Sequence, residues 1–222
     1  MRELPLPLAL TARLLPVALL ASAGWALTSG PFAAAPAADD SGRKNAAAPG
    51  SDESAPSTSA AAKTYTKPPA PCDSLAEKTV KSLVPGAKTA GQEITSSDRS
   101  VRRTCSWNAL KGYDYRWLDV SYEIKDSDAK AKSAYEQRVT EKSGGGAVPG
   151  LGDAAYSVVN LTTEDKQQSR EGAVIARVAN AVVVVTYNGS DFETKKAPGT
   201  DEINKGAIKA AKEAVAALTE AQ

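Results

Sequence analysis

The chain has only two cysteines, Cys72 and Cys105, and this pair constrains the fold more than any other feature. We expect one disulfide, which would clamp the start of a folded domain to one of its early strands. The bridge would close a loop of about 34 residues, for which the chain-entropy model gives roughly 3.5 to 4 kcal/mol of stabilisation. A redox-active pair is the alternative, but such pairs usually have Cys-x-x-Cys spacing. We therefore interpret the pair as a structural bridge.

The amino terminus has the features of an export signal. Basic residues precede an apolar run at 14–27. This run is too short for a membrane-spanning helix, which needs about 20 apolar residues. We assign residues 1–38 to a signal peptide, with Ala35-x-Ala37 as the preferred cleavage motif and Ala21-x-Ala23 as the second choice. An uncleaved anchor formed by residues 14–27 is the alternative. Export would place the chain outside the cell or in its envelope, where the oxidising environment favours a disulfide.

A linker and one domain are expected after the signal. Residues 39–69 are mostly Ala, Ser, Pro, Gly and Lys, and Tyr65 is their only aromatic residue. Such a composition buries too little apolar surface to offset the entropy cost of ordering, so we predict a disordered linker. The remaining residues, 70–222, match the usual size of a single domain.

Three helices are predicted in this domain. Ser74 followed by Glu77 fits the capping box of a short helix that ends at Pro85-Gly86. Ser127 is placed to cap a second helix, which runs to about Lys142 and has only a thin apolar stripe for the surface of a sheet. The third helix covers residues 201–221, and its apolar stripe consists of Ile208, Ala211, Val215 and Leu218.

Strands are predicted between these helices, at residues 92–96, 101–107, 115–125, 154–161, 172–178 and 181–187. Residues 117–124 alternate between polar and apolar side chains, which is typical of an antiparallel sheet with one buried face. Residues 182–185 are all valine, so we place their strand at the centre of the sheet. Ala179-Asn180 is expected to turn a hairpin, and Asn188-Gly189 to end the last strand. The order of elements predicts an α+β domain with a mostly antiparallel sheet and flanking helices.

The composition excludes several functions. The chain has no histidine, which removes the usual general base, the Ser-His and Cys-His pairs, and the commonest metal ligand. With 27 basic and 26 acidic residues, its charge favours no nucleic-acid partner. Residues 150–155 fit the G-x-G-x-x-A dinucleotide pattern, but a glycine loop precedes them and a strand follows, which is the wrong context. We therefore predict neither enzyme activity, nor a cofactor, nor a metal.

One set of residues is a candidate ligand surface. Tyr113, Tyr115 and Trp117 have the same parity along a strand, with Arg116 between them and Trp107 upstream. An exposed aromatic row beside a cation is typical of a ligand or glycan platform. The alternative is that these rings pack under a helix or across a hairpin.

Several motifs together resemble a known family. Pro71-Cys72 opens a short helix, Cys105-Ser106-Trp107 follows, and residues 148–155 read Val-Pro-Gly-Leu-Gly-Asp-Ala-Ala. In this order they resemble a family of actinobacterial exported proteins and lipoproteins that is classed as a domain of unknown function. The resemblance covers about residues 69–221 and implies an envelope-associated α+β domain, a disulfide between Cys72 and Cys105, and no assigned activity. This chain differs from the usual members because it has no lipidated cysteine after the signal.

The sequence thus predicts an exported, non-enzymatic domain, secreted or envelope-associated, that binds a ligand or protein partner. Its partner is not specified, and a membrane is expected only through an uncleaved amino-terminal segment. The alternatives are a membrane-tethered sensor or scaffold, and an enzyme that works without histidine.

Overall fold

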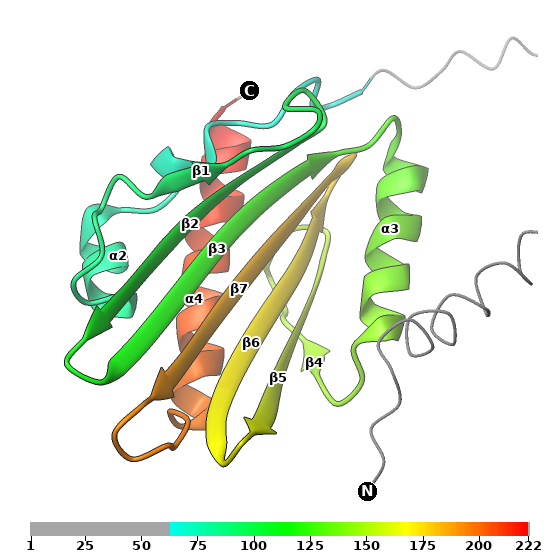
Figure 1. Cartoon of the computed structure of the whole chain (residues 1–222). Coiled ribbons are helices and arrows are strands. Elements are labelled where there is room, and N and C mark those ends of the chain that lie inside the picture. Colours follow the sequence, from blue (N-terminus) through cyan, green and yellow to red (C-terminus); the bar gives the residue numbers. More distant parts are fainter. Residues whose placement is uncertain (1–62, 222) are drawn as a thin grey trace, which may run out of the picture. The chain divides into compact units, whose positions relative to one another are not determined.

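The structure is a computed structural model that describes residues 63–221 (Figure 1). The predicted signal segment, residues 1–38, and residues 39–62 of the predicted linker lie outside the described residues. The helical elements are η1 (Pro71–Asp73), α2 (Glu77–Leu83), α3 (Asp128–Glu141) and α4 (Thr200–Glu220). The strands are β1 (Gln92–Ile94), β2 (Arg102–Lys111), β3 (Asp114–Ile124), β4 (Gly146–Ala147), β5 (Ala154–Glu164), β6 (Gln167–Val178) and β7 (Ala181–Asp191).

The seven strands form one antiparallel sheet in the order β1-β2-β3-β7-β6-β5-β4. The predicted α+β class and antiparallel sheet are therefore confirmed. The central position of the valine strand is also confirmed, because β7 lies between β3 and β6. The predicted end of this strand at Asn188-Gly189 is wrong. β7 continues to Asp191 because residues 188–191 pair with the first half of β3. The glycine at 189 fits there because a Cβ would lie 2.1 Å from Arg116 Nη1.

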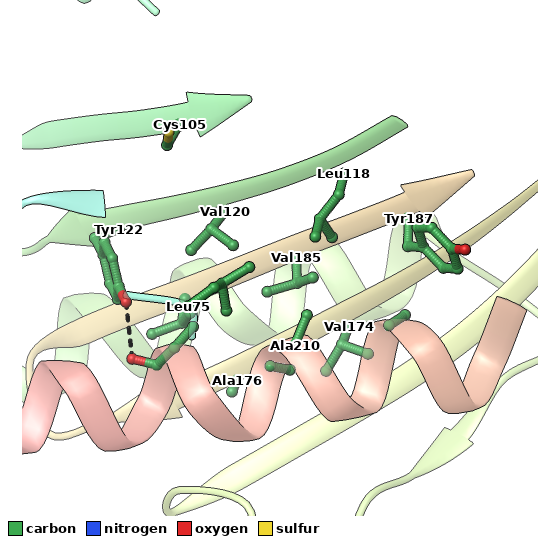
Figure 2. Close-up of a cluster of buried hydrophobic side chains, with 14 of the residues drawn as sticks. Leu75, Cys105, Leu118, Val120, Tyr122, Val174, Ala176, Val185, Tyr187 and Ala210 are labelled. Carbon is green, nitrogen blue, oxygen red and sulfur yellow. Dashed lines mark hydrogen bonds between the residues drawn. The ribbon is translucent and has the colours of Figure 1, made fainter. Parts of the chain in front are cut away.

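The main core lies between the sheet and α4, on what we call the inner face (Figure 2). Strand side chains such as Leu118, Val120 and Val185 point toward this helix. Two tyrosines at its border are tied to backbone carbonyls: Tyr122 donates to Ala214 O and Tyr187 to Leu83 O, both at 2.8 Å. Burial raises the pKa of both phenols, that of Tyr187 to about 12.

Helix α4 lies close to the sheet because its inner side consists largely of small residues. Ile203, Gly206, Ala207, Ala210, Ala211, Ala214 and Leu218 are buried, whereas the predicted stripe residues Ile208 and Val215 are only half-buried. A Cβ at Gly206 would come within 2.6 Å of the Tyr187 ring, which shows how closely the helix packs. The buried side of α4 therefore differs from the predicted stripe and consists mainly of alanines.

Helix α3 covers part of the opposite, outer face of the sheet. Ala131 packs there against Ile175 and Val182, with Tyr135 beside them. Ser127 caps the helix, as predicted: its hydroxyl accepts a hydrogen bond from the Lys130 N–H at 3.2 Å. The apolar stripe of α3 is thin, so it buries a second and much smaller cluster.

The capping box predicted at Ser74 and Glu77 is not formed. The Ser74 hydroxyl instead donates to Pro71 O at 2.6 Å, and α2 begins at Glu77 after Ala76. The proline at the start of η1 favours this earlier turn, which shifts the entry of α2.

The predicted disulfide between Cys72 and Cys105 is present, with an S–S distance of 2.04 Å. It joins η1 to β2, and Cys105 is fully buried. The folded domain begins earlier in the chain than predicted, because residues 63–69 of the predicted linker lie against it. Tyr65 is buried there, and its backbone N–H and C=O each bond the side chain of Asn180 at 2.8 Å.

Candidate binding surface

The outer face of the sheet is covered unevenly. Helix α3 packs against β6 and β7 and reaches the far end of β3 through the Arg138–Glu123 ion pair. In the part of the chain that the structure describes, no helix lies over β2 or over β3 around Trp117 on this face (Figure 1). We call the polar and aromatic surface left there the β2–β3 shelf, which consists of Thr104, Ser106, Asn108, Trp117 and Asp119. The register places its members side by side, with Ser106 opposite Asp119 and Asn108 opposite Trp117.

Trp117 lies along the shelf. Its Nε1 donates to Ser106 Oγ at 2.8 Å and to Asp119 Oδ1 at 2.7 Å. Ser106 and Asp119 form the next cross-strand pair on the same face, and at the usual rise of a strand this pair lies roughly 7 Å from the pair of Asn108 and Trp117. The indole therefore extends along the sheet, and the side chain stays 38% exposed. A tryptophan fixed in this way offers a ring face to a ligand at little further cost in side-chain entropy.

A groove continues the shelf toward the loop before β2. Its volume is about 470 Å³, and Arg102, Thr104 and Asp119 are among the residues that line it. The loop wall is held by Asp98, whose Oδ1 accepts from the N–H and the hydroxyl of Ser100 at 2.8 and 2.6 Å. The hydroxyl of Ser100 holds the pKa of Asp98 below its ordinary value. Ile94 and Val101, which are 45% and 44% exposed, add apolar surface nearby.

Only some of the predicted surface residues meet on the shelf. Trp117 belongs to it, and Tyr113 is 58% exposed at the adjoining hairpin turn. Tyr115 is half-buried and stacks on Phe192, with ring centroids 6.0 Å apart. The aromatic residues therefore do not form one continuous exposed row.

Two predicted members lie on the inner side of the sheet and are not part of the shelf. Trp107 is 1% exposed and packs in the main core, because its position in β2 has the same parity as Cys105. Arg116 points toward the amino-terminal end of α4, where Nη2 donates to Glu202 at 2.8 Å. Its Nε lies 3.4 Å from Asp114, so the cation is part of a local ion-pair network.

The sequence reasoning missed the polar members of the shelf. Ser106 and Asp119 became functional candidates only through their contact with Trp117, which depends on the register between β2 and β3. One signal was present: Cys105 and Trp107 share a parity, so the residues between and around them had to face the other side.

One buried carboxylate near this face is explained by its ion pairs. Glu123 accepts from Lys125 at 2.9 Å and from Arg138 at 2.7 Å, and its side chain is 7% exposed. Burial raises the pKa of Glu123, but Lys125 and Arg138 together outweigh this effect and hold its pKa below the ordinary value. Glu123 is therefore ionised at neutral pH and ties α3 to the sheet.

Within residues 63–221, no group of three or more acidic, cysteine or histidine side chains is placed to hold a metal ion. No helix in the same range is both long and apolar enough to cross a membrane.

Comparisons with known proteins identify no family for this chain. No family model matches it, and neither does any curated protein. A crystal structure from Bacteroides thetaiotaomicron is similar to part of it, with 11% sequence identity and a TM-score of 0.33. The similar part covers 53% of this chain and 46% of that chain. A likeness of this size carries no argument about function.

Proposed function

We propose that this protein is an exported, non-enzymatic domain, secreted or associated with the cell envelope, that binds a partner through the β2–β3 shelf. The observation that carries the proposal is Trp117, which two hydrogen bonds hold along a sheet face that α3 leaves uncovered. Tryptophan is enriched among the residues that contribute most of the binding energy at protein interfaces.

Export is supported by the amino-terminal sequence and, more weakly, by the disulfide. The apolar run at 14–27 follows a basic start, and disulfides persist mainly in oxidising compartments. Amino-terminal sequencing of the exported protein tests this part. A mature start near Ala38 supports a secreted domain, whereas an intact amino terminus in the membrane fraction would favour a tethered sensor or scaffold.

The non-enzymatic part is supported by the side chains that the chain lacks or has engaged. It has no histidine, both cysteines form the disulfide, and the buried Glu123 has a lowered pKa, whereas a general acid needs a raised one. Activity-based probes for serine hydrolases test the proposal, and labelling of the folded domain would contradict it.

Binding is tested by co-sedimentation of the purified full chain with the insoluble envelope fraction of the producing cells. We expect wild-type protein to sediment and Trp117→Ala to lose about tenfold in affinity, because the central aromatic anchor is removed. Leu161→Ala is the matched control, since Leu161 is an exposed apolar residue on β5, away from the shelf. Equal sedimentation of wild type and Trp117→Ala would exclude the shelf as the binding surface. Repeating the assay with protease-treated envelope separates a protein partner from a polymer.

A further inference from the structure

The edge of the sheet beside the shelf is only half occupied. β1 pairs with β2 over three positions, from Ile94 opposite Thr104 to Gln92 opposite Ser106, whereas β2 continues to Lys111. In the part of the chain that the structure describes, no strand pairs with residues 107–111 on this side.

The core explains why β1 pairs with β2 no further than Ser106. The chain leaves the edge at Gly91, which has a φ of +63°. An added Cβ at Gly91 would lie 2.6 Å from both Cys105 Sγ and Trp107 Nε1, so only glycine fits. Trp107 Nε1 also donates to Thr89 O at 2.9 Å, which fixes the preceding loop. The disulfide and Trp107 thus direct the chain away from the second half of β2.

The backbone groups on this free edge are identified by the neighbouring ladder. Ile124 donates its N–H to Val101 O at 2.8 Å, so Val101 faces β3. The direction of backbone groups alternates along a strand, and therefore Asn108 and Leu110 direct their N–H and C=O groups to the open edge. These four groups match the hydrogen-bonding pattern of one further strand.

The free edge is the wall of a groove of about 580 Å³. Residues 86–88 of the loop before β1 also line the groove, and Gly86 and Ala87 contribute little side-chain bulk there. Leu110, which is 57% exposed, offers apolar surface, and Lys88 is the charged residue that lines the groove. Trp117 lies across from Asn108 on the outer face, so the groove and the shelf adjoin.

We propose that this groove binds an extended peptide segment of a protein partner, which adds to the edge of β2 as a further strand. The proposal rests on the proposed binding function and names the class of partner. The open backbone groups of Asn108 and Leu110 select an extended polypeptide, and alternate peptide side chains would contact Leu110 and the shelf. Lys88, with Lys111 at the end of the strand, favours a peptide that carries a carboxylate. A second copy of this chain would instead bring like charges to the same short groove.

The other edge of the sheet supplies a matched control. Val148 donates its N–H to Ala155 O at 2.9 Å, so odd-numbered residues of β5 face outward on that side. Leu161 is therefore, like Leu110, an exposed leucine whose N–H points to a free sheet edge. A proline at either position removes one outward N–H and leaves the ladder to the neighbouring strand intact.

The test is selection of peptides from a displayed random library of about nine residues, long enough for one strand. The immobilised full chain is the target, and selected peptides are synthesised and titrated by fluorescence anisotropy. We expect the selected peptides to carry acidic side chains. Their affinity should fall about tenfold or more for Leu110→Pro and no more than about twofold for Leu161→Pro. Hydrogen exchange should slow at the amides of Asn108 and Leu110 when peptide is added.

Lys88→Glu gives a second measurement that does not depend on proline, because Lys88 is exposed and its reversal leaves the fold intact. It should weaken acidic peptides severalfold. The proposal is overturned if no peptide distinguishes wild type from both Leu110→Pro and Lys88→Glu, or if these two amides are not protected. Self-association that Leu110→Pro abolishes would show a second copy as the occupant. Envelope binding that survives protease treatment and depends on Trp117 would keep the shelf but exclude a peptide partner.

Discussion

At the scale of single residues, Gly91 shows how closely the chain approaches its own disulfide. Its positive φ and the short distances from a Cβ to Cys105 and Trp107 are two separate reasons for a glycine at this position. Gly112 has nearly the same φ, +64°, but nothing lies within 4 Å of its Cβ position. The two glycines therefore separate backbone strain from steric conflict.

We expect Gly91→Ala to lower the free energy of unfolding by about 3 kcal/mol, since backbone strain and overpacking of the core both contribute. Gly112→Ala should cost about 1 kcal/mol, because it introduces the strained φ alone. Urea denaturation followed by circular dichroism measures both. Equal losses for the two variants would show that the core around Trp107 accommodates the added methyl group with no loss of stability.

Glu123 makes the stability of the fold depend on pH. Its folded-state pKa lies below the ordinary value of 4.5, so its contribution is present above pH 4.5 and is lost as the pH falls through the folded-state pKa. Glu123→Gln should therefore destabilise the protein by about 2 kcal/mol at pH 7 and reduce the loss of stability between pH 5 and pH 3. Thermal unfolding across this range is the measurement. Parallel curves for wild type and variant would exclude this carboxylate as a source of the pH dependence.

The faces of β2 illustrate what residue-level reasoning leaves open. Period-2 alternation correctly separates Trp117 from Leu118, because β3 has a clear apolar face. In β2, Arg103 has the same parity as Cys105 and Trp107, so polarity does not separate the two faces, and the inner face is marked mainly by the disulfide and one ring. An aromatic residue at such a position fits either face until a neighbouring strand sets the register.

At the scale of elements, the start of α2 depends on a residue far away in the sequence. Glu213 on α4 accepts hydrogen bonds from the Ala76 N–H at 3.0 Å and from the Thr79 hydroxyl at 2.6 Å. Glu77, which the capping-box pattern assigns to this role, instead pairs with Lys81 on the exposed side of the helix. A local motif cannot reveal a cap that tertiary packing supplies.

This difference gives a direct comparison of the two carboxylates. Glu213→Ala should destabilise the protein by about 1 to 2 kcal/mol, since it leaves the N–H at the helix start without its acceptor. Glu77→Ala should cost no more than about 0.5 kcal/mol, because exposed ion pairs at this spacing contribute little. Chemical denaturation of both variants measures the two losses of stability. A larger loss for Glu77→Ala than for Glu213→Ala would indicate that the capping box forms after all.

The helix and strand types were predictable because each has a strong local pattern. The valine run, the hairpin turn at Ala179-Asn180 and the Ser127 cap all follow from local chemistry. The buried stripe of α4 was displaced because alanines carry a weak hydrophobic signal, yet close packing of a helix on a sheet requires small residues. The continuation of β7 past Gly189 depends on pairing with β3, which is distant in the sequence, so it has no local signal.

At the scale of the whole molecule, the sheet joins segments that are distant in the sequence. β3 pairs with β7 along its full length, although α3 and two further long strands separate them in the chain. Antiparallel hairpins follow from short turns, but the choice of which hairpins lie side by side depends on the shared core under α4. The early ordering at Tyr65 has the same origin, because its partner Asn180 lies in a distant turn.

The disulfide acts at this largest scale, since it ties the segment that enters the domain to the edge of the sheet. Replacing both Cys72 and Cys105 by alanine should lower the free energy of unfolding by roughly 3.5 to 4 kcal/mol, mainly because the unfolded chain gains freedom. The denaturant m-value should rise, since an unfolded chain without the bridge exposes more surface. Cys105 is fully buried, so part of the loss comes from removing its sulfur atom from the core. Thr104→Ala, beside Cys105 and half-buried, controls for a general weakening of β2. Mass spectrometry without reduction confirms the bridge in the exported protein, and two free thiols in a fully stable protein would contradict this role.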